Sequence, residues 1–380
     1  MFTFAFAAGS VCVLAWLYLL AARGGFWRIP RAPGHALPAE KTVTVAVVIP
    51  ARNEADVIAR AVASLLRQNF RNLQVFVIDD SSTDGTADAA RQAAPSSDQL
   101  TVISGVPLPA GWSGKLWAVQ QGVEQALRIQ PDFLLLTDAD IEHALGSVAT
   151  LVGIAEAGRY DVASFMVRLH CQSFAEKLLI PAFVFFFFLL YPPQWVRDPR
   201  RRTAGAAGGC LLIRRSALDR VGGIAAIRHE IIDDCALARA VKRSGGKVWL
   251  GATSDTHSMR PYNSFAEVER MIARTAFNQL HHSGLLLSGT VIGMLLLYVL
   301  PLALIVSGSA RLAMTGVAAY ALMAGAYLPM VRFYRRNPLW ALTLPLAGVF
   351  YTAATIHSAI KYWSGRGGEW KGRTQDVIDQ

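Results

Sequence analysis

The sequence predicts an α/β fold with a mostly parallel sheet, joined to apolar helices that span a membrane. Two observations lead to this fold class. Between about residues 41 and 250, short β-branched segments alternate with helical segments of about 10–15 residues, and this alternation is typical of βαβ units. Outside that region, uncharged apolar segments of about 20 residues occur at the N-terminus and in the last quarter of the chain. Such segments are long enough to cross the hydrocarbon core of a bilayer.

Residues 2–22 form the first apolar segment and carry no charge. A secretory signal peptide would have basic residues before this segment, whereas Arg23, Arg28 and Arg31 follow it here. We therefore interpret residues 1–23 as an uncleaved transmembrane anchor. Basic residues beside a span stay on the cytoplasmic side, so the following domain is expected at the cytoplasmic face of the inner cell membrane.

The elements of the sheet can be placed in order along the chain. The β-branched stretch "TVTVAVVIP" ends at a proline and predicts a strand of a covered parallel sheet. In the next segment apolar residues recur at helical spacing, and Asn53 is in position to cap that helix. The alternation then continues: strands are predicted at 42–50, 73–80, 100–104 and 132–140, and a helix at 115–129.

Residues 178–195 form a short aromatic segment, "LLIPAFVFFFFLLYPPQW", and an arginine cluster follows within 197–202. An aromatic segment beside arginines is typical of an element in the lipid headgroup region. A buried core helix fits the composition equally well, so both interpretations of 178–202 stay open.

The C-terminal quarter is predicted to contain transmembrane helices within 285–360, followed by a basic tail at 361–380. Three crossings would place this tail on the side opposite the cytoplasm, although its charge favours the cytoplasm. A re-entrant or interfacial candidate would remove the conflict, and the third candidate is the weakest because it contains a proline and a histidine. The candidates are 285–306, 312–331 and 338–360.

The composition narrows the range of partners. Hydrophobic residues make up 53% of the 380 residues, charged residues only 17%, and the formal net charge is +10. Such a charge favours nucleic acid, anionic lipid or phosphorylated ligands. Because the arginines concentrate beside apolar segments, we expect anionic lipid and no nucleic acid. The four cysteines lie far apart without a CxxC pair, which argues against a disulfide framework or a zinc site.

Polar residues follow three of the predicted strands. Asp138 and Asp140 end the apolar run in "FLLLTDADI", and Asp79 and Asp80 end "LQVFVIDD". The tripeptide "RNE" at 52–54 follows the first strand. Ligands of parallel sheets bind outside the carboxyl ends of the strands, so these groups are expected to line one crevice.

Two common phosphate-binding loops are absent from the sequence. The segment after the first strand lacks GxGxxG, and "PAGWSGKL" has a proline where a P-loop requires glycine. A divalent cation is another way to bind phosphates, because Mg²⁺ and Mn²⁺ take carboxylate ligands together with the oxygens of a substrate diphosphate. An Asp-x-Asp motif places two carboxylates beside one ion, whose charge removes their repulsion. The sequence therefore predicts Mg²⁺ or Mn²⁺ as a cofactor.

Six motifs follow one another over about 200 residues: "VVIPARNEA", "VFVIDDSSTDGT", "WSGKLWAVQQG", "LLLTDADI", "GGCLLIRRSALDRVGG" and "IIDDCALARAVKRSGGKVWL". Together they resemble the motifs of family 2 glycosyltransferases. The resemblance implies a Rossmann-like α/β domain of the GT-A type over 42–282 and a nucleotide-sugar donor. With "FAEVERMIARTAFNQL", the apolar segments and "GGEWKGR", the chain resembles a membrane-bound branch, the hopene-associated glycosyltransferases.

The resemblance implies roles for residues that match the family's motifs. Lys115 would contact the nucleotide or its phosphates. Asp138 would face the ribose or the metal, and Asp140 would ligate the metal that bridges the diphosphate. Gly208 and Gly209 would let the backbone approach the acceptor. The remaining nucleotide-sugar contacts are assigned to Pro50, Arg52, Glu54, Asp79 and Arg274.

Asp233 and Asp234 in "HEIIDDCALA" resemble the family's ED motif, although the first position is usually Glu. The resemblance implies that Asp234 is the general base of an inverting transfer. Such a base takes the proton from an acceptor hydroxyl, whose oxygen attacks the anomeric carbon opposite the leaving nucleoside diphosphate. The pair also fits the N-terminus of the helix that follows, and the two roles are compatible.

The function predicted from these features is transfer of a single sugar from a nucleotide sugar, expected to be UDP-linked, to a lipid hydroxyl. The narrower resemblance implies a hopanoid acceptor. A processive synthase is disfavoured, because only Arg274 remains of the QxxRW motif found in processive relatives. Two alternatives stay open: a polyprenyl-phosphate glycosyltransferase, whose phosphate nucleophile needs less help from a base, and a non-catalytic membrane protein that binds nucleotide.

Overall fold

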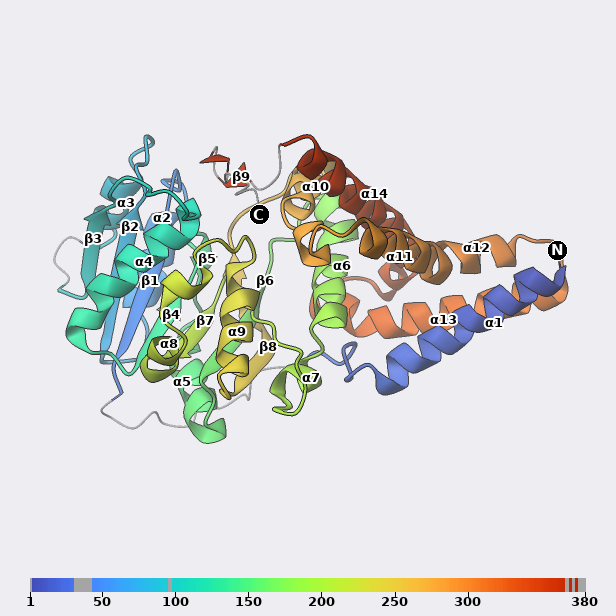
Figure 1. Cartoon of the computed structure of the whole chain (residues 1–380), viewed down its shortest axis with the longest axis horizontal. Helices are drawn as coiled ribbons and strands as arrows, with labels where there is room; N and C mark the ends of the chain where they lie inside the picture. Colours follow the sequence, from blue (N-terminus) through green and yellow to red (C-terminus); the bar gives the residue numbers. More distant parts are fainter. Residues whose placement is uncertain (1, 31–42, 95–97, 366–368, 371–372, 375–380) are drawn as a thin grey trace. The chain divides into compact units, whose positions relative to one another are not determined.

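Figure 1 shows the computed structural model, which describes residues 2–30, 43–94, 98–365, 369–370 and 373–374. Arg31, the predicted domain start at 42 and most of the tail at 361–380 lie outside the described residues. The chain forms two compact units. The sheet unit consists of Pro30–His170, Trp195–Arg260 and Glu369–Gln380, and the helical unit consists of Met1–Ile29, Cys171–Gln194 and Pro261–Gly368. The sheet unit therefore differs from the continuous domain predicted over 42–282, because 171–194 and 261–282 pack with the apolar helices.

A mixed eight-stranded sheet forms the centre of the sheet unit. Its strands are β1 (Val45–Ala51), β2 (Leu73–Asp79), β3 (Leu100–Ser104), β4 (Phe133–Leu136), β5 (Ile141–Glu142), β6 (Val162–Arg168), β7 (Leu211–Arg214) and β8 (Val248–Ser258). They stand in the order β3-β2-β1-β4-β7-β6-β8-β5. Neighbours are parallel except where β7 joins β4 and β6 and where β5 joins β8. This arrangement confirms the predicted mostly parallel α/β fold.

The direction of the strands brings distant parts of the chain to one edge of the sheet. β1, β2, β4 and β8 point the same way, so their carboxyl ends lie at the same edge. β7 runs in the opposite direction, and its first residues therefore come to that edge as well. The loops that carry most of the predicted site residues begin or end there.

Helices cover both faces of the sheet. α2 (Ile58–Leu66) and α5 (Ser147–Gly158) share one core with alternate residues of β1, such as Val47 and Ile49. α4 (Gly114–Ala126) lies on the other face (Figure 1), where Gly122 packs against Val48. Every residue of β1 is buried, as expected for a strand covered on both faces. Further elements of this unit are α3 (Thr86–Gln92), η1 (Leu127–Ile129), α8 (Arg215–Arg220), η2 (Ile224–Ile227), α9 (Asp233–Arg243), β9 (Glu369–Trp370) and β10 (Arg373–Thr374).

The substitution Gly122→Val is expected to destabilise the protein, because a Cβ at this position would clash with Ile78 and lie 2.5 Å from Val48 Cγ1. Overpacking a core costs typically about 1–3 kcal/mol, and the displaced helix carries Lys115 near its start. Thermal unfolding in detergent measures the loss. Gly289→Val is the matched control, since nothing lies within 4 Å of a Cβ there. Equal losses in both variants would contradict the packing explanation.

The loops that follow β1 and β2 are tied together by hydrogen bonds. The backbone amide of Asn53 donates to Ser82 Oγ at 3.0 Å, and Thr83 N donates to Asn53 Oδ1 at 2.9 Å. The predicted capping role of Asn53 is therefore wrong. α2 starts later in the chain, with Val57 at the N-cap position and no side-chain cap. The side chain of Asn53 instead connects two strand ends at the carboxyl edge.

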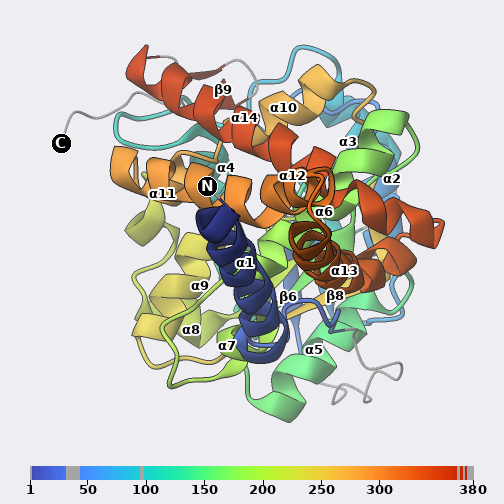
Figure 2. The ribbon, with the colours of Figure 1, turned by 90° about the vertical axis from the view of Figure 1, so that its right-hand side faces the viewer.

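Apolar helices form the helical unit (Figure 2). They are α1 (Phe2–Ala22), α6 (Phe174–Leu190), α10 (Phe265–Ala273), η3 (Asn278–Leu280), α11 (Gly284–Met294), η4 (Leu295–Val299), α12 (Leu300–Ile305), α13 (Ala310–Phe333), η5 (Pro338–Thr343) and α14 (Leu344–Trp363), with α7 (Pro193–Arg197) following α6 in the chain. Among the described residues, four stretches are long and apolar enough to cross a membrane: Phe2–Ala22, Gly284–Ile305, Ala310–Phe333 and Pro338–Trp363. They coincide with the predicted anchor and the three C-terminal candidates, and the crossings and their direction stay predictions.

Small residues and hydrogen bonds hold these helices together. A Cβ on Gly316 of α13 would lie 2.6 Å from the carbonyl oxygen of Pro301, so only glycine permits this approach. The indole Nε1 of Trp16 in α1 donates to the carbonyl of Leu297 at 3.2 Å. Such contacts are typical of helices in lipid, where the hydrophobic effect does not drive helix association. The N-terminal helix is therefore a packed member of the helical unit.

α6 lies inside the helical unit and packs against α10, α13 and α14. Many of its apolar side chains, including Phe185 and Phe188, are buried. The helix begins with a capping box between Ser173 and the buried Glu176. Contact of residues 178–202 with lipid headgroups stays a prediction.

Candidate active site

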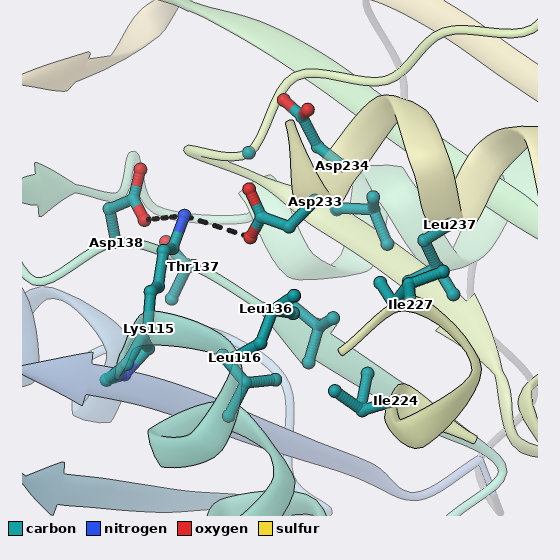
Figure 3. A pocket seen from close by; sticks show the side chains of 14 residues that line it. Lys115, Leu116, Leu136, Thr137, Asp138, Ile224, Ile227, Asp233, Asp234 and Leu237 are labelled. Carbon is teal, nitrogen blue, oxygen red and sulfur yellow. Dashed lines mark ion pairs between the residues drawn. The ribbon is translucent and has the colours of Figure 1, made fainter. Parts of the chain in front are cut away.

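Predicted site residues from several parts of the chain line one pocket at the carboxyl edge of the sheet (Figure 3). They come from the end of β1, the start of α4, the loop after β4, the segment before β7 and the start of α9. The recess is partly open to solvent. Its polar side is formed by Lys115, Thr137, Asp138, Asp233 and Asp234, and the rest of its lining includes Pro50, Gly208, Leu116, Leu136, Ile224, Ile227 and Leu237.

Lys115 forms the centre of the polar side. Its Nζ lies 2.9 Å from Asp138 Oδ1 and 3.1 Å from Asp233 Oδ2. Ser113 caps α4 by accepting a hydrogen bond from Leu116 N, which fixes the helical turn that carries Lys115. Burial alone would lower the pKa of the Lys115 amine, but the carboxylates of Asp138 and Asp233 outweigh it and raise the pKa above its ordinary value. Lys115 therefore stays positively charged. It lies between an aspartate that follows a strand and an aspartate at the start of a helix.

Asp234 has the electrostatic environment of a general base. Burial, and then the charge of Asp233, raise the pKa of the Asp234 carboxyl to about 7, and a base with a pKa near the working pH is effective. A Cβ on Gly208 would lie only 3.2 Å from Asp234 Oδ2, so a glycine there leaves room beside the carboxylate. Both aspartates stand in the first turn of α9, whose N-cap residue is Ile232. The pair thus lies at the positive end of the helix dipole, although neither residue is the N-cap.

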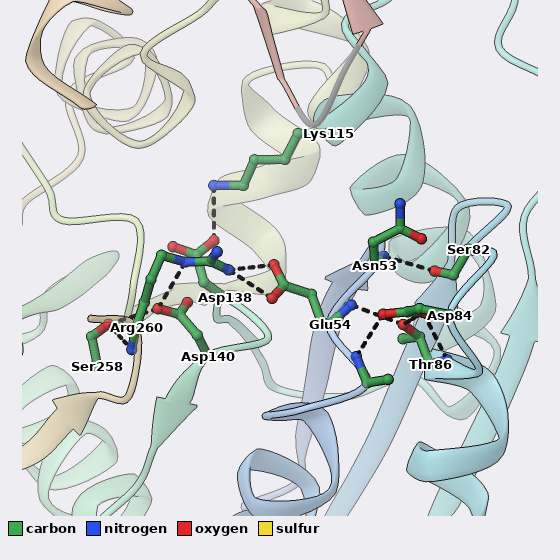
Figure 4. Close-up of polar contacts among 11 residues, drawn as sticks. Asn53, Glu54, Ser82, Asp84, Thr86, Lys115, Asp138, Asp140, Ser258 and Arg260 are labelled. Carbon is green, nitrogen blue, oxygen red and sulfur yellow. Dashed lines mark hydrogen bonds and ion pairs between the residues drawn. The ribbon is translucent and has the colours of Figure 1, made fainter. Parts of the chain in front are cut away.

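A second polar cluster joins Asp140 to Glu54 (Figure 4). Arg260 donates from Nη2 to both oxygens of Glu54 at 2.5 and 2.6 Å, and its Nε lies 3.5 Å from Asp140 Oδ2. Ser258 Oγ donates to the same oxygen of Asp140 at 2.6 Å. The sequence pattern did not indicate Arg260, because the alternation of strands and helices is recognisable only to about residue 250. β8 continues to Ser258, so Arg260 follows the end of a strand. The rule that singled out Asp138, a polar residue just after a strand, therefore applies to Arg260 as well.

Two of the residues predicted to bind the nucleotide lie beside the strand ends and contact the protein itself. Arg52 donates from Nη1 to the carbonyl oxygen of Asp80 at 2.6 Å. Asp79 Oδ1 accepts a hydrogen bond from Ser82 N at 3.3 Å. Both residues are outside the lining of the pocket, and their contacts with a donor stay predictions.

Gly209 and Arg274 are not part of the pocket lining. Gly209 packs against Ile141 and Val167, and is therefore a packing position beside the site. Arg274 belongs to the helical unit, where it is exposed and forms the C-cap of α10. Its predicted contact with the diphosphate stays a prediction.

The donor atoms at this edge fit a hard divalent cation. Asp138 and Asp140 offer carboxylate oxygens, the ligand type that Mg²⁺ and Mn²⁺ prefer. Among the described residues no group of three or more His, Cys, Asp or Glu side chains is arranged to hold an ion, but one or two carboxylates suffice when a diphosphate completes the coordination. Burial raises the pKa of Asp138 although Lys115 opposes the shift, so additional positive charge would be favourable there. The two aspartates thus fit an ion shared with a diphosphate.

A buried polar network supports the strand end that precedes these aspartates. Thr137 Oγ1 donates to the carbonyl of Gly209 at 2.8 Å and lies 3.0 Å from His143 Nε2. The backbone amide of His143 donates to Ser64 Oγ at 2.9 Å, and its Nδ1 lies 3.3 Å from Ser147 Oγ. Burial lowers the pKa of the His143 imidazole to about 4, so the ring is neutral at pH 7. No sequence pattern indicated this network, because its members come from separate elements.

The substitution His143→Gln is expected to make the fold less sensitive to acid. The pKa of the imidazole lies near 4 in the folded protein, against an ordinary value of 6.5, so the wild-type protein loses stability as the pH falls from 6.5 towards 4. The loss should be roughly 2 kcal/mol between pH 7 and pH 5, and glutamine removes it. Thermal unfolding at both pH values measures the difference, with the exposed His229→Gln as control. An undiminished acid loss in His143→Gln would contradict the assignment.

Comparison with known proteins agrees with this geometry. Residues 46–222 match the family described as Glycosyl transferase family 2. Residues 46–222 thus resemble a family 2 glycosyltransferase domain. The matched segment includes Lys115, Asp138 and Gly208, and it ends before α9. The placement of Asp233 and Asp234 in the candidate site therefore rests on the pocket geometry.

Two curated proteins resemble parts of this chain. The 4,4'-diaponeurosporenoate glycosyltransferase of Staphylococcus haemolyticus (strain JCSC1435) is 33% identical over 113 residues, which are 29% of this chain and 28% of that protein. The succinoglycan biosynthesis protein ExoU of Rhizobium meliloti (strain 1021) is 48% identical over 59 residues, which are 16% of this chain and 17% of that protein. Each match thus spans less than a third of the relative's length.

A solved structure resembles the chain over nearly its full length. It is the mannosyltransferase PcManGT from Pyrobaculum calidifontis in complex with GDP-Man and Mn²⁺, with a TM-score of 0.53 and 20% identity, covering 95% of this chain and 96% of that one. Similarity at this level of identity concerns the fold. Together with the family match, it confirms the predicted GT-A architecture.

Proposed function

We propose that the protein is a membrane-anchored inverting glycosyltransferase that moves a single sugar from a nucleotide sugar to a lipid hydroxyl. The observation that carries the proposal is the pocket in which Lys115, Asp138 and Asp234 meet at the carboxyl edge of a GT-A sheet. The donor is proposed to be UDP-linked and the acceptor a hopanoid, as the sequence resemblance implies. The divalent cation proposed as cofactor would be held by Asp138 and Asp140.

The residues of the pocket support a direct displacement. Asp234 would take the proton of the acceptor hydroxyl, whose oxygen bonds to the anomeric carbon as the bond to the leaving diphosphate breaks. Lys115 would hold a positive charge next to the diphosphate, where negative charge develops. A divalent cation, when bound, supplies further neutralisation of that charge.

The apolar helices support a lipid acceptor. A soluble acceptor would not require four stretches of membrane-spanning length, whereas a lipid acceptor has to be reached at the bilayer surface. Arg23 and Arg28 follow the first of these stretches. By the positive-inside rule we infer a multi-pass protein of the inner membrane with its sheet unit in the cytoplasm.

Mass spectrometry of lipids tests the proposal directly. Cells with and without the protein are compared, and the expected result is one glycolipid that is missing without it. The masses of that lipid identify sugar and acceptor. A polyprenyl-phosphate sugar as the missing species would establish the alternative acceptor class. An unchanged lipid profile, together with no binding of UDP or GDP to the purified protein in Mn²⁺, would rule out the proposed activity.

A further inference from the structure

Each aspartate of the Asp-x-Asp motif already faces a cation of the protein. Lys115 Nζ lies 2.9 Å from Asp138, and Arg260 Nε lies 3.5 Å from Asp140. Figure 4 shows the two cations approaching the motif from different elements. The proposed metal ligands are therefore ion-paired with side chains of the chain itself.

Arg260 is held in place from several directions. Its Nη2 donates to both oxygens of Glu54, and charge-assisted hydrogen bonds of this kind are short and strong. Its backbone amide donates to Ser258 Oγ at 3.3 Å, and the neighbouring Met259 N donates to the carbonyl of Asp140 at 2.8 Å. The segment after β8 is thus bound to the motif by backbone as well as side chain. Asp140 Oδ2, which faces Arg260, also accepts from Ser258 Oγ.

A fixed guanidinium beside Asp140 acts oppositely on the two components of a metal–diphosphate ligand. It repels a free divalent cation that approaches the carboxylate, and it attracts a diphosphate that approaches the same edge. Once the diphosphate is present, its negative charge offsets the guanidinium and the repulsion of the metal falls. The two components should therefore bind cooperatively.

We propose that Arg260 couples metal binding to donor binding: it suppresses binding of the free divalent cation at Asp140 and admits the cation together with a nucleoside diphosphate. Arg260 is thus a positioning and selectivity residue for the donor. The inference rests on the proposed function, because it takes the ligand to be a metal–nucleoside diphosphate complex. Its practical consequence is that the Asp-x-Asp carboxylates stay paired with protein cations until the donor arrives.

Titration calorimetry of purified full-length protein tests this coupling. Mn²⁺ alone, UDP alone, and Mn²⁺ in the presence of saturating UDP are titrated, and GDP is used in parallel. The variants are Arg260→Gln, which removes the charge, and Arg260→Lys, which keeps it. Arg220→Gln is the matched control, because Arg220 forms an ion pair with Asp161 at 3.1 Å elsewhere in the sheet unit.

Arg260→Gln is expected to bind free Mn²⁺ roughly 5–20-fold more tightly than the wild type, and to bind UDP alone more weakly. UDP tightens Mn²⁺ binding by a certain factor in the wild type, and in this variant that factor should be smaller by about the same 5–20-fold. The reason is that the coupling between the two ligands is reciprocal. Arg260→Lys should bind free Mn²⁺ within about threefold of the wild type. Glu54→Gln provides a test of opposite sign: it removes a negative charge and releases the guanidinium towards Asp140, so free Mn²⁺ should bind more weakly.

The outcomes separate this inference from the proposed function. Unchanged or weaker binding of free Mn²⁺ in Arg260→Gln would overturn the inference, and so would equal shifts in Arg260→Gln and Arg260→Lys, because a purely structural role predicts the same change in both. If the wild type binds neither nucleotide in Mn²⁺, the proposed function fails, while the titrations with Mn²⁺ alone still decide the role of Arg260.

Discussion

Replacing Asp234 by asparagine is expected to reduce sugar transfer by about 10²–10⁴-fold while leaving donor binding nearly intact. Asparagine preserves the shape of the side chain but does not accept the proton of the acceptor hydroxyl. The pocket retains Lys115 and Asp138, whose ion pair at 2.9 Å does not include Asp234. Turnover is measured with the acceptor lipid in detergent, and donor affinity is measured by calorimetry with UDP and Mn²⁺.

Stability separates a chemical defect in Asp234→Asn from a folding defect. Because the pKa of Asp234 is raised from its ordinary value of 3.8 to about 7, the unfolded carboxyl ionises before the folded one. This group therefore costs increasing stability as the pH rises from about 4 to 7, and a constant amount above 7. The variant should therefore be at least as stable as the wild type at pH 8, with its advantage shrinking as the pH falls below 7. Asp88→Asn, at an exposed ion pair of α3, is the control. Near-normal turnover in Asp234→Asn would point to a phosphate acceptor instead of a hydroxyl.

The substitution Lys115→Met should abolish donor binding and also weaken the fold. Asp138 and Asp233 both depend on the Lys115 ammonium for charge compensation, and breaking a buried pair by removing one partner is costly. We expect a destabilisation of about 1–3 kcal/mol, less than for fully buried pairs because the three side chains are partly exposed. Transfer should fall by at least about 10²-fold.

The pH dependence of Lys115→Met follows from the same charges. Burial already raises the pKa of the Asp138 carboxyl and Lys115 opposes that shift, so without the ammonium this pKa rises further above that of the unfolded chain. Stability is then retained at low pH and lost as the pH rises towards 8. Thermal unfolding between pH 5 and pH 8 measures this slope. Lys247→Met, at an exposed lysine of the sheet unit, should show no such slope. A flat profile for Lys115→Met would contradict the central role of the ion pair.

Much of the candidate site was predictable because parallel strands present their carboxyl ends at one edge. Asp138 follows from a strand pattern that is local in the sequence, whereas Pro50 and Lys115 were assigned through the family resemblance, and all three line one pocket. Asp233 and Asp234 were indicated by family resemblance and helix position, and the fold places them opposite Lys115. Short-range patterns and the family resemblance together identified most of the residues that line this pocket.

Arg260 and His143 could not be identified in the same way. Arg260 acquires its role through pairing with Glu54, which is 206 residues away in the chain. His143 is neutral and buried because Thr137, Ser64 and Ser147 surround it, and a lone histidine in a sequence gives no sign of such surroundings. Asn53 shows the converse: its local pattern suggested a helix cap, but a hydrogen bond to the neighbouring loop replaced that role.

Local patterns in the chain therefore account for the α/β class, the apolar stretches and the acidic strand ends, because hydrophobic periodicity and turn chemistry act over a few residues. Three-dimensional folding decides how the charges are paired. Lys115 bridges Asp138 to Asp233, and Arg260 joins Asp140 to Glu54. These pairings depend on which strands become neighbours and on how deeply each charge is buried. The reason is that electrostatic energies depend on distance and burial in space, whatever the separation of the residues along the chain.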